Sequence, residues 1–471
     1  MLPSVIHFLP IENKKTWAPS YLVILIETIL FLLYFKTQNL YLVAALILFF
    51  ILFCWIFFSL TNTFILLFTI ISILPSESWG IRYPFFHGIY FKIQYIYIFT
   101  AFILLWIAFN KPFRVDFKQK SSGLDLVLFF FLSFSVLAAF RGGIEGEFAY
   151  LELTFLLLYA FYFIFKYQLT YRQLTILWRA FMGISIFVSI EYILLAYSEV
   201  SNSDLMVFRV VTRQPHLAQF AFPFFFTYFL TPHSKRIRLL AGLSIVCILS
   251  MVFLSQQRGL WVGIVATLLT LLASYYFIGK KITLMRIIKF IGILFVFIVI
   301  LFGVLFLLDK LFLGSVLLTL VDRIDSILNY SMDISMKVRF SEISRAMDQW
   351  SHDPFTMLFG TGLGAKIHSI DPSRQNTTSV DNSYILFLWK MGIIGLSFFI
   401  MTMLLMVKKV FIGMKKATVQ EKQILLSIFS GFIGLFFIAI TNACLYRYRF
   451  IIVWAFALAL IDVISLRNQS S

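Results

Sequence analysis

Charged residues are scarce in this chain, and their scarcity excludes a soluble globular protein. Asp, Glu, Lys and Arg make up 13% of the 471 residues, whereas soluble domains typically carry about 25%. Hydrophobic residues reach 61%. Apolar blocks of roughly 15 to 25 residues recur from end to end, the length that a helix needs to cross a bilayer. The composition therefore indicates a membrane protein with many spans.

Cysteine is also rare. The three cysteines, Cys54, Cys247 and Cys444, lie in or beside apolar blocks, so we interpret them as small core residues and predict no disulfide and no metal site. The chain lacks the strict alternation of membrane barrel strands, a fixed-period repeat and a Pro-rich or Ser-rich linker. The first apolar stretch, 21–35, is not followed by the small residues that signal peptidase requires, so we expect it to be retained. These absences leave an all-α polytopic membrane protein.

The apolar blocks predict about fourteen transmembrane helices, with twelve as the lower bound. Lys and Arg in short loops mark the cytoplasmic side and predict cytoplasmic N- and C-termini. Residues 1–308 hold the first eleven spans, 309–381 form one long, partly helical external loop with an amphipathic helix at about 334–350, and 382–471 hold the last three spans and a short tail. The predicted spans are 20–35, 40–58, 62–75, 93–109, 124–140, 148–165, 179–197, 217–231, 238–256, 259–278, 288–308, 382–407, 423–442 and 449–466.

The net charge of +17 follows from this topology. More than half of the basic residues fall in the predicted cytoplasmic segments, Lys166, Lys408 and Lys409 among them. A basic face against anionic lipid headgroups explains this charge without a nucleic-acid partner. Glu27 and Glu191 are the main charges inside predicted spans, and the sequence offers no account of them.

Several arginines lie on the opposite, translocated side. Arginine near hydrocarbon costs about 2.5–3.5 kcal/mol on insertion scales, so such residues are often functional or paired. In FRVVTRQPHLAQF (208–220), Arg209, Arg213 and His216 gather at the start of a span. The arginines either reach the headgroups or form an anion site with the helix start. Arg258, in the tight turn of LSQQRGLWVG, is either an interfacial anchor beside Trp261 or an anion ligand.

The external loop carries the next candidates. Within RFSEISRAMDQW (339–350) two rows recur at helical spacing, and Asp353 with Pro354 ends the helix. The apolar row predicts a stripe against the membrane domain, and the charged row is either a solvated face or part of a site. The apolar row is Phe340, Ile343, Met347 and Trp350, and the charged row is Arg339, Glu342 and Arg345.

The loop closes on a glycine run and a polar pair. GTGLG (360–364) is a weak nucleotide motif because no βαβ unit surrounds it, and we predict a turn that brings backbone close to a ligand or a helix. Asp381 and Asn382 stand at the head of the span 382–407. They suit a helix cap, and Asp381 also suits a general base that takes the proton of a sugar hydroxyl.

Taken together, these motifs resemble the O-antigen ligase and O-antigen polymerase superfamily of bacterial membrane glycosyltransferases. The resemblance rests on RVVTRQPHLAQ, the RG of SQQRGLW, the loop with GTGLG, and DNSY followed by GIIGL, in this order across 208–396. It implies a GT-C-like fold and an inverting, metal-independent transfer of glycan from a polyprenyl diphosphate, with no cofactor, on the outer face of the bacterial cytoplasmic membrane. It also implies that Arg258 and Arg339 hold the diphosphate. The surrounding substrate-binding candidates are Arg209, Arg213, His216, Arg345 and Asn382.

One position departs from the family pattern. The ligases have His immediately before this Asn, where the chain has Asp381. Asp among arginines is a weaker base than His, so the departure favours a polymerase over a ligase; Asp381 acts either as the base or as a group that orients Arg339 or Arg258. The implied partners are an undecaprenyl-diphosphate-linked oligosaccharide, membrane lipids and a chain-length regulator protein. A carrier without chemistry, such as a flippase, is the alternative of another class, and it predicts charges at mid-membrane positions.

Overall fold

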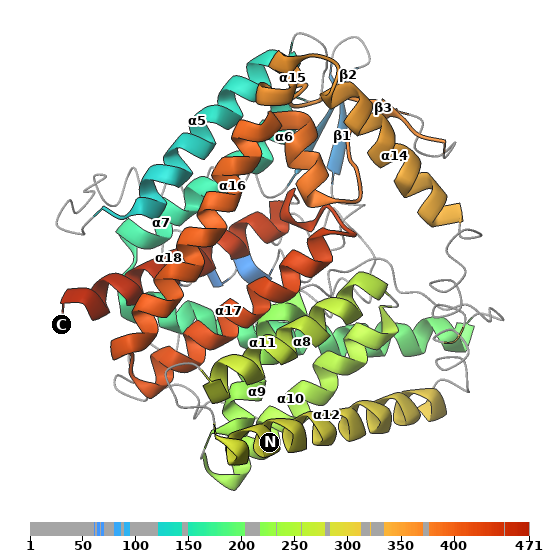
Figure 1. Ribbon diagram of the computed structural model, residues 1–471. Helices are drawn as coiled ribbons and strands as arrows, with labels where there is room; N and C mark the ends of the chain where they lie inside the picture. The colour runs from blue at the N-terminus through green and yellow to red at the C-terminus, as the bar shows by residue number, and fades with distance from the viewer. Residues whose placement is uncertain are drawn as a thin grey trace. The chain divides into compact units, whose positions relative to one another are not determined.

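Figure 1 shows the computed structural model of the chain. The structure describes residues 61, 64–65, 67–69, 80–85, 89–94, 121–143, 149–202, 217–231, 233–255, 257–277, 283–311, 321, 334–370, 376–446 and 448–470. These residues fall into two compact units.

The first unit comprises Met1–Phe117 and Leu169–Ile184. Its described part includes an antiparallel hairpin of β1 (Gly80–Phe85) and β2 (Ile89–Gln94), in which Gly80 lies opposite Gln94 and Phe85 opposite Ile89. The hairpin was not predicted from the sequence. The unit also includes the first part of α8 (Tyr171–Asn202).

The second unit comprises Lys118–Gln168 and Ser185–Ser471 and carries the candidate site. In chain order its helices are α5 (Gly123–Gly143), α6 (Ala149–Leu157), η3 (Leu158–Ala160), α7 (Phe161–Gln168), the second part of α8, α9 (Ala218–Leu230), α10 (Lys235–Leu254), α11 (Arg258–Phe277), α12 (Leu284–Leu311), α14 (Ile334–Trp350), α15 (Pro354–Phe359), α16 (Ser383–Lys416), α17 (Val419–Ala439), η6 (Cys444–Tyr446) and α18 (Tyr448–Ser470). Strands β3 (Ile367–His368) and β4 (Asn376–Thr377) pair antiparallel within the long loop.

Eight helices of the described residues are long and apolar enough to cross a membrane, so the chain is a multi-pass membrane protein. They are α5, α8, α10, α11, α12, α16, α17 and α18. Two further predicted spans, 148–165 and 217–231, correspond to α6–η3–α7 and to the short apolar helix α9. The predicted spans 20–35 and 40–58 lie outside the described residues, as do most of 62–75 and nearly all of 93–109. The number fourteen and the cytoplasmic position of both ends stay predictions.

One bundle of the second unit is formed by α5, α6–α7, α16 and α18, which pack on one another as Figure 1 shows. Its core is aromatic: Phe387 and Phe399 stack at 4.5 Å between ring centroids, and Phe399 stacks on Trp454 at 6.0 Å. Helix α18 is buried on all sides from Phe450 to Leu460. A helix that is apolar all round and enclosed in this way is the central member of its bundle.

A second bundle is formed by α9, α10, α11 and α17, which also pack on one another. Small residues let the helices approach closely. A Cβ at Gly431 would lie 2.7 Å from the carbonyl oxygen of Gln219 on α9, and a Cβ at Gly263 of α11 would lie 2.9 Å from the Nε2 atom of Gln219. Gln219 is fully buried, and its Oε1 accepts a 2.7 Å hydrogen bond from Thr267. Gln219, the last residue of the RVVTRQPHLAQ motif, therefore lies where α9, α11 and α17 pack together.

Candidate functional site

Asp381 and Arg339 meet at the head of α16. The Nε atom of Arg339 lies 3.3 Å from Oδ2 of Asp381, with side chains 35% and 19% exposed. The helix cap is Asn382, whose Oδ1 accepts 3.0 Å hydrogen bonds from the amides of Tyr384 and Ile385. Asp381 is therefore not required as the cap, and its carboxylate faces the loop helix α14.

Arg258 is the first residue of α11 and is half-buried. A Cβ on its neighbour Gly259 would overlap Oγ1 of Thr441, so the head of α11 lies against the turn that follows α17. The same turn holds the head of α16, because Asn382 Nδ2 donates to the carbonyl of Ile440 at 2.9 Å. The starts of α11 and α16 therefore share one turn.

This arrangement concentrates positive potential at one corner. Helix starts carry partial positive charge, and a cation placed there is unfavourable unless an anion is present. Arg258 opens one helix, and Arg339 pairs with the residue just before the other. Asp381 supplies one negative charge. Two helix starts with two guanidiniums suit a phosphate group, which accepts hydrogen bonds from both kinds of donor.

The face of α14 differs from the prediction. Phe340, expected in a stripe against the membrane domain, is 56% exposed, whereas Glu342 of the charged row is fully buried. Glu342 accepts a 2.8 Å hydrogen bond from Ser369, and Arg345 donates to the carbonyl of His368. Two residues of the charged row, Glu342 and Arg345, therefore attach α14 to the segment after the glycine run, and the third, Arg339, pairs with Asp381.

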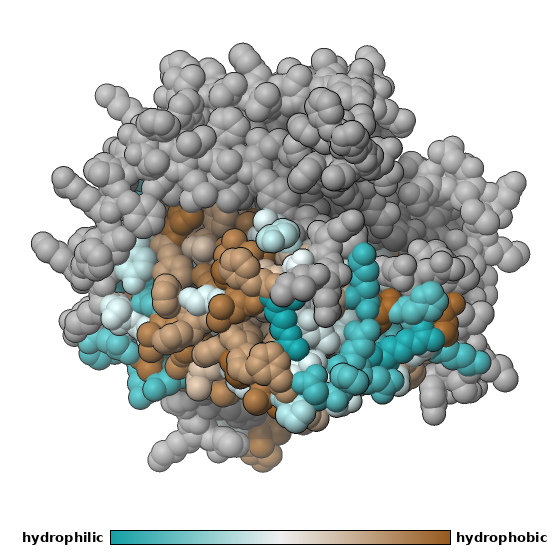
Figure 2. Space-filling view, turned by 90° about the horizontal axis from the view of Figure 1, so that it is seen from above, coloured by the Kyte–Doolittle hydropathy of each residue, from teal (hydrophilic) through white to brown (hydrophobic). Residues whose placement is uncertain are grey.

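Figure 2 views the molecule from above, the side on which α14 and α15 lie in Figure 1, and the coloured residues show a hydrophilic band beside a hydrophobic area. On α14 the exposed residues include Lys337 and Asp348, and on α15 they include Phe355 and Leu358. The loop thus presents both polar and apolar surface to its surroundings.

The glycine run docks on a broken helix. Gly392 interrupts α16 with φ 65° and ψ −170°, a conformation that is essentially restricted to glycine. The carbonyls of Trp389 and Lys390, which a regular helix would satisfy internally, accept instead from the amides of Thr361 at 2.8 Å and Gly362 at 3.1 Å. The predicted turn therefore approaches a helix.

Close backbone contact explains why glycines are needed there. Gly360 has φ 79° and Gly362 has φ 100°, in the left-handed region. A Cβ at Gly360 would overlap the backbone of Lys390, and one at Gly362 would lie 2.5 Å from the amide nitrogen of Gly142 in α5. The run is packed between α5 and α16.

A buried carboxylate joins this loop to the bundle. Glu152 of α6 is 5% exposed and pairs with the fully buried Lys390 of α16. Its Oε2 also accepts from the amide of Gly364 at 2.8 Å and from the hydroxyl of Tyr446 at 3.1 Å. We call Glu152, Lys390, Tyr446 and the Gly364 amide the loop-side cluster.

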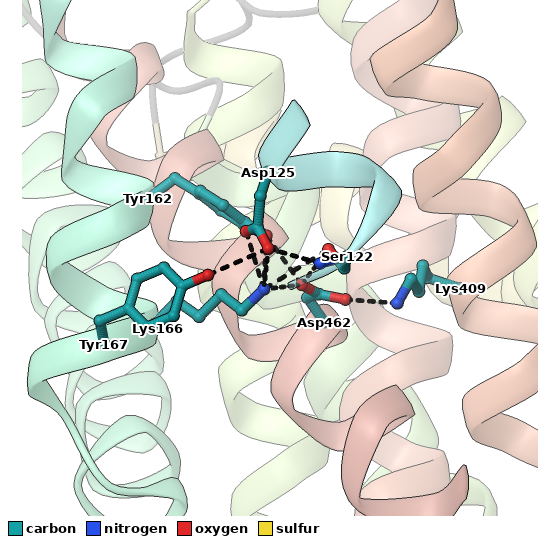
Figure 3. Close-up of polar contacts among 7 residues, drawn as sticks. All are labelled: Ser122, Asp125, Tyr162, Lys166, Tyr167, Lys409 and Asp462. Atoms are coloured by element: carbon teal, nitrogen blue, oxygen red, sulfur yellow. Dashed lines mark hydrogen bonds and ion pairs between the residues drawn. The ribbon is translucent and has the colours of Figure 1, made fainter. Parts of the chain in front are cut away.

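A second buried cluster lies at the other end of the same helices (Figure 3). Lys166 of α7 is fully buried and lies 2.6 Å from Asp125 of α5 and 2.8 Å from Asp462 of α18, while Lys409 of α16 lies 2.7 Å from Asp462. Ser122, Tyr162 and Tyr167 complete the hydrogen bonds. We call these seven residues the far cluster. Two lysines balance two aspartates, so this cluster binds four helices together.

Sequence reasoning missed both clusters. Lys166 and Lys409 were predicted as cytoplasmic loop cations, and the structure places them in helices as partners of buried carboxylates. Glu152 and Lys390 lie inside the predicted spans 148–165 and 382–407, and a charge in a span is a sign of a functional or paired group. That signal was available. Of the two glutamates that were singled out, Glu191 is buried in α8, and Glu27 lies outside the described residues.

Three predicted substrate-binding residues, Arg209, Arg213 and His216, lie outside the described residues. Among the residues that the structure does describe, no group of three or more His, Cys, Asp or Glu is arranged to hold a metal ion.

Residues 243–400 match a family model described as Wzy_C, O-antigen ligase. The predicted resemblance to the O-antigen ligase and polymerase superfamily is confirmed. The O-antigen ligase match covers about a third of the chain and contains Arg258, Arg339 and Asp381, together with the glycine run and Lys390. Members of the family are glycosyltransferase-like enzymes of lipopolysaccharide and polysaccharide assembly that act on lipid-linked oligosaccharides in membranes. A comparison with curated proteins found no match.

Proposed function

We propose that this protein is an O-antigen or polysaccharide polymerase that transfers glycan from a polyprenyl-diphosphate donor to a sugar hydroxyl of another lipid-linked repeat unit. The observation that carries the proposal is the pair of Arg339 and Asp381 at the head of α16, on the turn that also holds the head of α11 with Arg258. In this proposal the arginines would hold a leaving diphosphate, and the carboxylate would accept the proton of an acceptor hydroxyl.

In the proposed step the acceptor oxygen attacks C1 of the donor sugar on the face opposite the diphosphate. The bond between C1 and the diphosphate oxygen breaks, and the diphosphate leaves with the electron pair. Arg258 and Arg339 stabilise the charge that develops on it, and the hydroxyl proton passes to Asp381. Preorganised charge of this kind is usually the largest catalytic contribution, and removing one donor typically costs about 10²–10³ in kcat.

The contact between Arg339 and Asp381 gives the step an order. While the pair is closed, the carboxylate is occupied by the guanidinium. A diphosphate competes for Arg339 because a bidentate phosphate contact is stronger than a single partly exposed ion pair. Donor binding would then release the carboxylate for the acceptor. The two roles left open for Asp381, orienting Arg339 and acting as base, would follow one another in the cycle.

The test uses the purified protein in lipid nanodiscs with an undecaprenyl-diphosphate-linked repeat unit and no nucleotide. Chain growth that stops in Arg258→Ala and Arg339→Ala, with folding intact, supports the proposal. Arg236→Ala, an exposed arginine of α10 near its start, is the matched control. Wild-type rates in Arg258→Ala would refute the assignment of the diphosphate site.

A ligase is the second candidate, because the matched family is described as O-antigen ligase. In the same assay a ligase transfers glycan once to a lipid A core acceptor and leaves lipid-linked repeat units unextended. A carrier leaves the donor chemically unchanged and moves it between leaflets, which a protected-donor assay in vesicles detects.

A further inference from the structure

We propose that Glu152 is a positioning residue for the glycosyl transfer, holding both halves of the pair formed by Arg339 and Asp381 from a point inside the bundle. The expected effect of Glu152 on the reaction rate rests on the proposed function. Its effect on the positions of Arg339 and Asp381 rests on hydrogen bonds among the described residues.

The first connection runs through the glycine run to Arg339. Glu152 accepts from the amide of Gly364, at the start of the segment that continues to Ser369. That segment is bonded to α14 at three points: Lys366 carbonyl to Gln349 at 3.1 Å, His368 carbonyl to Arg345, and Ser369 to Glu342 at 2.8 Å. Residues 342, 345 and 349 lie on one face of α14, and Arg339 lies one turn earlier on the same face. The position of Gly364 therefore sets the position of Arg339.

The second connection runs through Tyr446 to Asp381. The hydroxyl of Tyr446 donates to Glu152 at 3.1 Å, and Tyr446 ends η6. The neighbouring amide of Leu445 donates to Oγ of Ser383 at 3.2 Å, and this hydroxyl donates to the carbonyl of Asn442 at 2.8 Å. Ser383 is two residues from Asp381 and opens α16. The hydroxyl of Tyr446 therefore fixes the head of the helix that carries Asp381.

Lys390 and two hydrogen-bond donors satisfy this carboxylate inside the bundle. A buried charge is retained only if it is paired and its remaining lone pairs are satisfied. The ammonium group of Lys390 forms the ion pair with Glu152. The amide of Gly364 and the hydroxyl of Tyr446 donate the other hydrogen bonds to its carboxylate. Glu152 thus contacts the loop at Gly364, helix α16 at Lys390, close to its break, and η6 at Tyr446.

A transferase depends strongly on such positioning. A misplacement of about 1 Å at reacting groups can cost about 10²-fold in rate. Loss of the Glu152 contacts should therefore lower kcat about a hundredfold. The KM for the donor should change less than about threefold, since both arginines remain present.

The decisive comparison uses two double variants that both remove the buried charges. Glu152→Gln with Lys390→Met keeps a side-chain oxygen that can accept from Gly364, whereas Glu152→Leu with Lys390→Met keeps the volume and removes the acceptor. We expect hydrogen exchange of the Gly364 amide and of 339–350 to rise at least about tenfold in the Leu variant only, with the fall in kcat confined to the same variant. Lys409→Met with Asp462→Asn disrupts the far cluster and should leave these exchange rates unchanged.

The outcomes separate the two proposals. Equal exchange in the Gln and Leu double variants overturns the positioning role. If the wild-type protein performs no transfer, the proposed function fails, and the exchange comparison still decides the structural connection. Should the Leu variant fail to fold, Tyr446→Phe tests the second connection alone: the amide of Leu445 should exchange faster while Gly364 stays protected, and an unchanged Leu445 amide counts against the inference.

Discussion

Replacing Asp381 by Asn separates the two roles proposed for this residue, because the roles differ in expected magnitude. The substitution keeps the size of the side chain and removes its charge. As an orienting partner, Asp381 forms a single ion pair with side chains 35% and 19% exposed. Pairs of this kind are worth about 0.2–1 kcal/mol. Since about 1.4 kcal/mol corresponds to tenfold in rate, loss of the ion pair itself accounts for less than about tenfold, and the oxygen that Asn keeps can still accept from Arg339 and hold it in place.

General base catalysis has a larger effect. A positioned base typically contributes about 10²–10⁴-fold, so Asp381→Asn should lower kcat at least about a hundredfold.

The assay is single-turnover transfer with an undecaprenyl-diphosphate-linked repeat unit. Asp353→Asn is the matched control, because it removes a carboxylate from the same loop and keeps an oxygen that can cap α15. A loss of less than about tenfold would refute the base assignment and leave orientation as the role of Asp381.

Three further perturbations test other parts of the structure. Lys166→Met should lower the free energy of unfolding by about 3–5 kcal/mol, because breaking one partner of a buried ion pair leaves an uncompensated charge; Lys166→Met with Asp125→Asn should recover part of this loss in thermal unfolding. Gly360→Ala should reduce turnover with helical content retained by circular dichroism, because its left-handed φ of 79° disfavours a side chain. Hydrogen bonds from the Thr356 side chain and amide lower the pKa of Asp353 from 3.8, so the cap of α15 should be present above that value and lost as the pH falls through the lowered pKa. Protection factors of the Thr356 amide measure this loss, and protection that persists in acid would contradict it.

Much of the fold could be predicted because the bilayer imposes simple rules. Apolar blocks of membrane-spanning length mark helices whatever their neighbours are, and ten of the predicted ranges correspond to helices of the described chain. The break at Gly392 could not be predicted, since a glycine in an apolar run is also common in an unbroken span. The break is explained by the glycine run of the loop, which is distant in sequence. Amides of this run hydrogen bond to the α16 carbonyls that the break leaves free.

The site was predictable to a similar degree. Arg339 and Asp381 were singled out by their predicted position on the translocated side, and the structure brings them into contact. On α14 the exposure of Phe340 and the burial of Glu342 were not predicted, because hydrophobic spacing does not reveal that Ser369 and the His368 carbonyl are the hydrogen-bond partners of Glu342 and Arg345. Glu152 could have been noticed as a charge inside a predicted span, but its three partners could not be inferred, because they come from distant parts of the chain.

The buried charges bear on the choice between an enzyme and a carrier. A carrier that moves a charged headgroup needs charged side chains along its path, and the spans do contain charged side chains. In the bundle of α5, α6–α7, α16 and α18, however, the buried charges of the described residues lie in two paired clusters near opposite ends of the helices. Glu152 lies in α6, and Lys166 lies 14 residues further along the chain in α7, beyond the 3-10 turn η3. Opening either cluster would leave buried charges uncompensated, at several kcal/mol each. The clusters therefore hold the bundle closed at both ends, an arrangement that favours chemistry at one face over passage through the bundle.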